Sequence, residues 1–232
     1  MARNDKIKIT RVSGALGAEV TGVDLSQKLD AETVATLRRA WLEHLVLFFP
    51  QQNLSDSDLE RFTACFGPFG KEPFVDGIST DHPNVLAVIK EADEARKANF
   101  GGNWHSDWSF QEAPPAGTFL YALQVPPYGG DTMWANQYLA YETLSPGLQK
   151  MLDGLEAMHS AKRPYGRQGI YADKNQARSM KIHTGVEAES EIAHPVVRVH
   201  AETGRKALYV NKVYTIRFKD MTAAESAPLL DY

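Results

Sequence analysis

The chain contains very little cysteine. Cys65 is its only cysteine among 232 residues, which excludes an internal disulfide and any cysteine-rich zinc or iron–sulfur site. No uncharged apolar run approaches the roughly 18 residues that a membrane span needs, and residues 1–10 lack the apolar core of a signal peptide. We therefore expect a cytoplasmic protein that makes no membrane contact.

The chain also lacks an excess of basic residues and the common nucleotide-binding motifs. Its formal net charge is -4, so we expect no nucleic-acid partner. The sequence contains no G-x-G-x-x-G, G-x-x-x-x-G-K-[ST] or G-x-S-x-G motif, and the run Gly67–Lys71 has the wrong spacing for a P-loop. These absences argue against nicotinamide binding, nucleotide hydrolysis and serine-hydrolase chemistry.

Apolar patterning predicts three helical segments. Residues 31–44 carry apolar side chains at helical spacing after Asp30, which is a suitable N-cap. Ser55 with Asp58 three residues later opens a second helix. A third segment, residues 137–153, is interrupted near Pro146. Residues 90–102 are expected to form a mobile loop, and residues 160–192 a long excursion or lid without a clear period.

Short apolar runs between turn residues predict the strands. The expected strands are residues 45–49, 85–89, 118–123 and 132–134, with a hairpin formed by 194–199 and 206–210. Strands dominate the middle of the chain, and neither a repeat nor a linker interrupts it. The pattern therefore favours a single domain over residues 1–232, mainly β with flanking helices, as in a β-sandwich or jelly roll.

The last residues carry the signature of a helix start. Thr222 and Glu225 form a capping box, so a helix is expected from about Ala223. The chain stops at Tyr232, soon after the apolar face of this helix begins. We therefore expect the given sequence to end inside a larger domain.

The segment Asn103–Asp107 contains a His-x-Asp motif. His105 and Asp107 are two residues apart, and on an extended segment such side chains point to the same side. One imidazole and one carboxylate with open positions form part of the ligand set of non-heme Fe(II) oxygenases. Ordinary hydrogen bonds at a strand end are the simpler alternative, but Trp104, Trp108 and Phe110 would keep water away from a site here. A zinc hydrolase is disfavoured because no H-x-H or H-E-x-x-H accompanies the pair.

Other candidate residues carry weaker signals. Gly129–Thr132 has the composition of a hairpin turn, and alternatively Thr132 offers a hydroxyl to an anionic co-substrate. The residues alone favour the turn. The remaining histidines are expected to pack or form hydrogen bonds rather than bind metal: His44, His82, His159, His183, His194 and His200.

Several ordered segments together resemble the taurine dioxygenase family, which also contains the herbicide-cleaving 2,4-D dioxygenase. The resemblance covers nearly the whole chain. It includes an opening Gly17-Ala18-Glu19 with Gly22-Val23-Asp24-Leu25, the metal segment Asn103–Asp107 followed by Pro114–Gly117, the strand Gly129–Trp134, and the later segments His194–Arg198 and Leu208–Asn211.

This resemblance implies a double-stranded β-helix that uses Fe(II), 2-oxoglutarate and O₂. His105 and Asp107 would be two iron ligands, and Thr132 would contact a 2-oxoglutarate carboxylate. Asn103 and Trp108 are candidate substrate contacts. The implied reaction converts 2-oxoglutarate to succinate and CO₂ while a small organic substrate is hydroxylated.

One departure from the family pattern affects the expected activity. The family places its second iron histidine, and an arginine for 2-oxoglutarate, beyond the helix at Thr222, so the fold is expected to be C-terminally incomplete. We expect weak iron binding and poor turnover from the 232 residues. A non-catalytic binding module that retains the fold is the alternative. A coding sequence that continues into the missing histidine and arginine would favour the oxygenase, and a stop codon after Tyr232 the module.

The primary substrate is only partly constrained by the sequence. Taurine-specific members hold the sulfonate with a His and a Tyr after the second helix, where this chain has Glu72 and Val75. Glu72 would repel a sulfonate, so taurine is disfavoured, whereas a small organic acid, an amine or another sulfonate stays open. The oligomeric state, monomer or homo-oligomer, is also left open.

Overall fold

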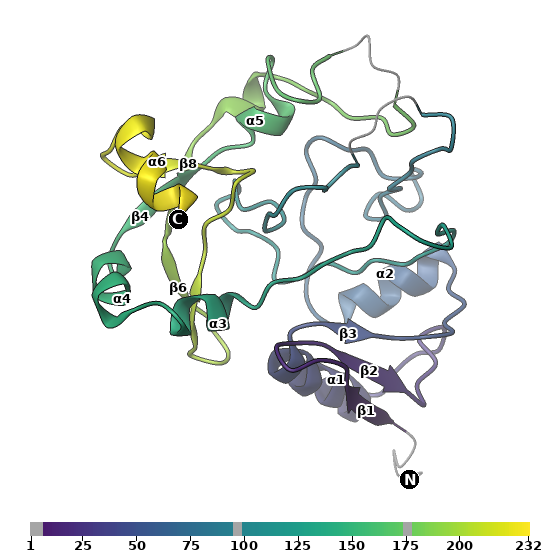
Figure 1. The fold of residues 1–232 in the computed structure, drawn as a ribbon. Helices are drawn as coiled ribbons and strands as arrows, with labels where there is room; N and C mark the ends of the chain where they lie inside the picture. Colours follow the sequence, from purple (N-terminus) through teal and green to yellow (C-terminus); the bar gives the residue numbers. More distant parts are fainter. Residues whose placement is uncertain (1–6, 95–98, 174–177) are drawn as a thin grey trace.

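A computed structural model describes residues 7–94, 99–173 and 178–232. Figure 1 shows an N-terminal layer of strands and helices at one end of the molecule and a second group of strands at the other, joined by a coil-rich middle region. Parts of the predicted loop 90–102 and of the excursion 160–192 lie outside the described residues. No helix in the described ranges is long and apolar enough to cross a membrane.

The N-terminal layer is a small mixed sheet covered by two helices. Strands β1 (Lys8–Arg11), β2 (Ala18–Thr21) and β3 (Leu47–Phe48) lie in the order β1-β2-β3, with β1 and β2 antiparallel and β2 and β3 parallel. Helices α1 (Ala31–His44) and α2 (Asp56–Ala64) accompany it. Their apolar faces meet the sheet in a core that contains Val20, Leu25, Leu37 and Phe62.

Both helices of this layer begin where the sequence predicts. The Asp30 side chain accepts the N–H of Thr33 at the start of α1, and Ser55 with Asp58 forms a complete capping box at α2. The predicted strand 45–49 is shorter than expected. Leu45 instead ends α1 in a left-handed conformation (φ 67°), and its N–H donates to the carbonyl of Trp41.

The second group is an antiparallel sheet with an attached hairpin. Strands β4 (Glu156–His159), β5 (Ile192–Pro195) and β8 (Thr215–Phe218) lie in the order β5-β4-β8. The predicted hairpin is confirmed as β6 (Val197–Val199) and β7 (Lys206–Leu208). The helices of this second group are short: α3 (Gln137–Glu142), α4 (Pro146–Leu152), α5 (Lys162–Tyr165), the 3₁₀ helix η1 (Val186–Glu189) and α6 (Ala223–Asp231).

Two local predictions in this group are confirmed. The helical stretch 137–153 is interrupted, because Ser145 caps α4 and Pro146 occupies its first turn. Helix α6 begins at Ala223 with the predicted capping box of Thr222 and Glu225.

Three strands predicted in the middle of the chain are not formed. Residues 85–89, 118–123 and 132–134 contain no strand, although Leu86 makes one isolated bridge with Gly77. The physical reason is the lack of neighbours: in the described residues no strand pairs with 118–123, and Leu120 and Leu123 stay 67% and 84% exposed. A jelly roll closed into one continuous core is therefore absent from the described ranges, which hold three small sheets.

Candidate metal centre

His105 and Asp107 face one another at the edge of the coil-rich region. His105 Nε2 lies 3.0 Å from Asp107 Oδ1, and their side chains are 25% and 42% exposed. The segment itself is coil followed by a turn at 107–110 rather than a strand. The expectation that both side chains point to the same side is nevertheless confirmed.

The outer atoms of this pair are held by two further hydrogen bonds. His105 Nδ1 lies 2.7 Å from the carbonyl oxygen of Asn103; a carbonyl only accepts, so Nδ1 carries the hydrogen. The Thr118 hydroxyl donates to Asp107 Oδ2 at 2.6 Å. Each side chain is therefore oriented through its outer atom, Nδ1 of His105 or Oδ2 of Asp107. Nε2 and Oδ1 are left facing each other. Histidines that bind metals in proteins are oriented in the same way, by donating the other ring N–H to a carbonyl or carboxylate.

The two groups shift each other's protonation in opposite directions. The hydrogen bond that His105 donates to Asp107 raises the pKa of His105 against the opposing effect of burial. The hydrogen bonds from His105 and then Thr118 lower the pKa of Asp107. The position between Nε2 and Oδ1 thus stabilises a proton. A metal cation in that position would be bound by the same two atoms.

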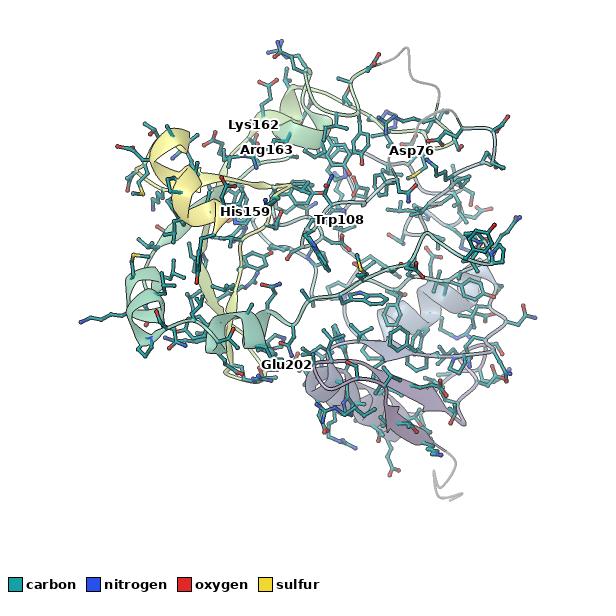
Figure 2. The ribbon with its side chains drawn as sticks, viewed as in Figure 1. Asp76, Trp108, His159, Lys162, Arg163 and Glu202 are labelled. Carbon is teal, nitrogen blue, oxygen red and sulfur yellow. The ribbon has the colours of Figure 1, made fainter. Side chains whose placement is uncertain are left out.

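The turn after Asp107 is conformationally unusual. Trp108 has a positive φ of 48°, a region that large side chains rarely adopt. Its ring packs so closely on Gly70 that a Cβ at this glycine would lie 2.6 Å from the ring. Figure 2 shows Trp108 in the middle of the molecule, between its two ends. Such a conformation persists only when its surroundings hold it in place.

A second carboxylate approaches the pair. Glu72 is half-buried, and its Oε1 accepts the N–H of Phe74 at 2.6 Å. Burial raises the pKa of Glu72, and the nearby negative charge of Asp107 adds to the rise. Glu72 and Asp107 are therefore close enough for their negative charges to oppose each other.

In the part of the chain that the structure describes, the side chains of the other predicted site residues make no hydrogen bond with the His105–Asp107 pair. The backbone carbonyl of Asn103 accepts from His105, and a substrate contact through its side chain stays a prediction. Thr132 is exposed, and within the described residues no hydrogen bond connects it to His105 or Asp107. Thr118 was missed by sequence reasoning, because a hydroxyl eleven residues away from its partner follows no local pattern. The described part of the chain contains no group of three His, Cys, Asp or Glu side chains able to hold a metal ion.

The remaining histidines have other partners, in line with the sequence expectation. His82 pairs with Glu60, His183 with Asp76, and the His194 ring contacts the Gln111 carbonyl. His159 is fully buried in β4, and its ring stacks on Tyr209 at 5.7 Å. Burial, followed by the proximity of His194, lowers the pKa of His159 to about 4.

This buried histidine predicts a loss of stability on mild acidification. Between the ordinary pKa of 6.5 and about 4, the unfolded chain binds a proton at His159 that the folded chain does not, so stability falls as pH falls. From pH 7 to pH 5 the expected loss from this residue is about 2 kcal/mol. Urea unfolding of the wild type and His159→Gln at both pH values measures it. Equal pH dependence of the two proteins would contradict the assignment.

Comparison with known proteins identifies the fold. A solved structure described as a taurine dioxygenase from Burkholderia xenovorans matches with a TM-score of 0.76 and 34% identity, covering 97% of this chain and 70% of that one. An alkylsulfatase of Acinetobacter baylyi is 37% identical over 212 residues, 90% of this chain. An alpha-ketoglutarate-dependent sulfate ester dioxygenase of Pseudomonas putida is 35% identical over 226 residues, 97% of this chain and 72% of its own length.

These similarities assign the chain to the fold class of the 2-oxoglutarate (alpha-ketoglutarate)-dependent dioxygenases, the double-stranded β-helix, of which the described residues form only three small sheets. The chain belongs to the taurine catabolism dioxygenase TauD, TfdA family, whose model matches residues 8–232. The chain spans 64% of the length of the Acinetobacter alkylsulfatase.

Proposed function

We propose that this chain carries two of the iron ligands of an Fe(II)- and 2-oxoglutarate-dependent dioxygenase, His105 through Nε2 and Asp107 through Oδ1. The observation that supports this most strongly is the arrangement behind the pair. The Asn103 carbonyl accepts a hydrogen bond from Nδ1 of His105, and the Thr118 hydroxyl donates one to Oδ2 of Asp107. The two remaining atoms, Nε2 of His105 and Oδ1 of Asp107, face each other at 3.0 Å.

The donor set fits the family's metal. An imidazole and a carboxylate are two members of the facial triad that leaves positions open for a co-substrate. When bound, iron supplies the redox chemistry by which O₂ converts 2-oxoglutarate to succinate and CO₂ and hydroxylates a small organic substrate. The chain's own residues orient the two donors: the Asn103 carbonyl holds His105, and the Thr118 hydroxyl holds Asp107. Thr132 is proposed to donate its hydroxyl to a carboxylate of 2-oxoglutarate.

A non-catalytic binding module is the second candidate, and one observation favours it. No third ligating side chain joins His105 and Asp107 among the described residues. Two protein donors predict weak metal binding, because affinity falls with each missing ligand. The two candidates differ in whether 2-oxoglutarate binds together with the metal.

The substrate is proposed to be a small organic molecule whose anionic group, if it has one, lies away from Glu72. The half-buried carboxylate of Glu72 adds negative charge next to Asp107, which disfavours a sulfonate there. The relatives described as an alkylsulfatase and a sulfate ester dioxygenase point to sulfur-containing esters as compounds to screen. Taurine is expected to be a poor ligand.

The test is an anaerobic titration with Fe(II) and 2-oxoglutarate, followed by the visible charge-transfer band of their chelate. We expect a band that saturates only at a large excess of Fe(II), that is lost in His105→Ala, and that taurine leaves unchanged. Absence of the band at every ratio would favour the non-catalytic module. A band of full intensity in His105→Ala would mean that other residues bind the metal.

Thr118 offers a milder test of the same arrangement. Thr118→Val keeps the shape of the side chain but removes the donor to Asp107 Oδ2. Residues that orient a metal ligand typically contribute 10- to 100-fold in affinity; water can replace this exposed hydroxyl in part, so we expect about a 10-fold weaker affinity for Mn²⁺. Titration followed by electron paramagnetic resonance measures it, and an unchanged affinity would show that Thr118 does not orient Asp107.

A further inference from the structure

The hydroxyl of Ser109, two residues after Asp107, is fully buried and makes two hydrogen bonds. Its Oγ lies 3.0 Å from His159 Nδ1, and the Asn211 side-chain amide donates to it at 3.1 Å. Because the Asn211 amide donates, the Ser109 hydroxyl proton is free to be donated to His159 Nδ1. His159 comes from β4 and Asn211 from the segment that precedes β8, so this single hydroxyl connects β4 with the segment leading into β8.

The His159 ring is locked in the orientation that makes this contact. The pairing of β4 with β8 shifts register between Met158 and His159, so the ladder is irregular at this residue. The ring stacks on Tyr209, and its Nε2 lies 3.5 Å from Thr215 Oγ1. This histidine therefore acts as a rigid support reaching from the sheet to the metal segment.

A second tie holds the same segment two residues further on. His194 Nε2, on β5, lies 2.8 Å from the carbonyl oxygen of Gln111, and the Gln111 side chain donates to the carbonyl of Lys71. The turn that follows Asp107 is thus connected to β4 and β5, and through Asn211 to the start of β8. These ties supply the surroundings that the positive φ of Trp108 requires.

We propose that Ser109, held by His159 and Asn211, is a positioning residue that fixes the Asp107 carboxylate relative to the sheet. This inference rests on the proposed metal-binding role of Asp107. Without the Ser109 hydroxyl, the turn loses its contact with β4 and keeps only the tie to β5 through Gln111. Trp108 then relaxes toward a common backbone conformation, and the carboxylate moves away from His105. Ser109 itself touches neither the metal nor a substrate.

The test compares Ser109→Ala with Ser160→Ala in the full chain. Ser160 is equally buried and adjacent to His159, but its hydroxyl donates to the Ala188 carbonyl and does not contact the metal segment. Mn²⁺ affinity is measured by electron paramagnetic resonance, and amide hydrogen exchange is measured over residues 103–111. We expect Ser109→Ala to weaken Mn²⁺ binding 10- to 100-fold and to speed exchange in that segment, and Ser160→Ala to do neither.

Ser109→Cys provides a variant of nearly the same shape with weak hydrogen bonding. It is expected to bind Mn²⁺ more weakly than the wild type but more tightly than Ser109→Ala. If Ser109→Ala does not fold, Ser109→Cys tests the positioning role of Ser109 in its place. Wild-type affinity and exchange in Ser109→Cys, or equal effects of Ser109→Ala and Ser160→Ala, would overturn the positioning role. If the wild type binds no Mn²⁺, the proposed function fails, and the exchange comparison still decides whether Ser109 holds the segment.

Discussion

Replacing Asp107 with alanine is expected to lower the affinity of the chain for Mn²⁺ by at least about 100-fold, beyond the range typical of residues that only orient a ligand. The carboxylate is one of two donors that face the proposed metal position, 3.0 Å from His105 Nε2. Its loss leaves a lone imidazole, which holds a divalent ion weakly. Electron paramagnetic resonance of free Mn²⁺ during titration measures the change.

The chain offers a matched control for this substitution. Asp76 lies 2.9 Å from His183 Nε2, and both side chains are well exposed. This second histidine–carboxylate pair has nearly the same separation, so Asp76→Ala removes a similar negative charge elsewhere. We expect it to leave Mn²⁺ affinity unchanged. A comparable loss in both variants would mean that Mn²⁺ responds to general charge rather than to the His-x-Asp pair.

Replacing Phe62 with alanine is expected to lower the free energy of unfolding by about 3–5 kcal/mol. Phe62 is 2% exposed, and its ring packs against those of Phe49, Phe66 and Phe119, with centroids 4.8–5.6 Å apart. Truncation removes all three contacts and leaves a cavity at the centre of the N-terminal core. Chemical unfolding followed by circular dichroism measures the loss.

This substitution is also expected to weaken Mn²⁺ binding. Phe119 follows Thr118, whose hydroxyl holds Asp107, so loosening the aromatic cluster loosens that donor. Met151→Ala, at a side chain 47% exposed on α4, is a control expected to change stability by less than about 0.5 kcal/mol. A loss below about 1 kcal/mol in Phe62→Ala would contradict the central place of this ring in the core.

Local features of the fold were predictable from the sequence because their causes are local. The caps at Ser55 and Thr222 and the helix break at Pro146 each depend on residues within one turn. The middle strands were not predictable in the same way. A strand needs a hydrogen-bonded neighbour, and in the described residues the apolar stretch 118–123 has none, so its composition alone did not make it a strand.

The candidate site shows the same division. The structure confirms the shared direction of His105 and Asp107, although their segment is coil rather than the extended strand from which their spacing predicts it. The Asn103 carbonyl that holds His105 is local, but the contacts made by Thr118 and by Ser109 reach partners 11 and 50 residues away. No periodicity links such positions, so only the tertiary structure identifies them. The proposed contact of Thr132 with 2-oxoglutarate stays a prediction.

The most direct test of the account is a zinc titration of the chain labelled with ¹⁵N at histidine, followed by nuclear magnetic resonance of the ring nitrogens. The arrangement at His105 predicts that Zn²⁺ shifts the Nε2 resonance while Nδ1 stays protonated, because the Asn103 carbonyl accepts its hydrogen. The His183 ring is expected to be unaffected. Zinc-induced shifts at Nδ1 of His105, or confined to His183, would contradict the assignment of His105 and Asp107 as the metal-binding pair.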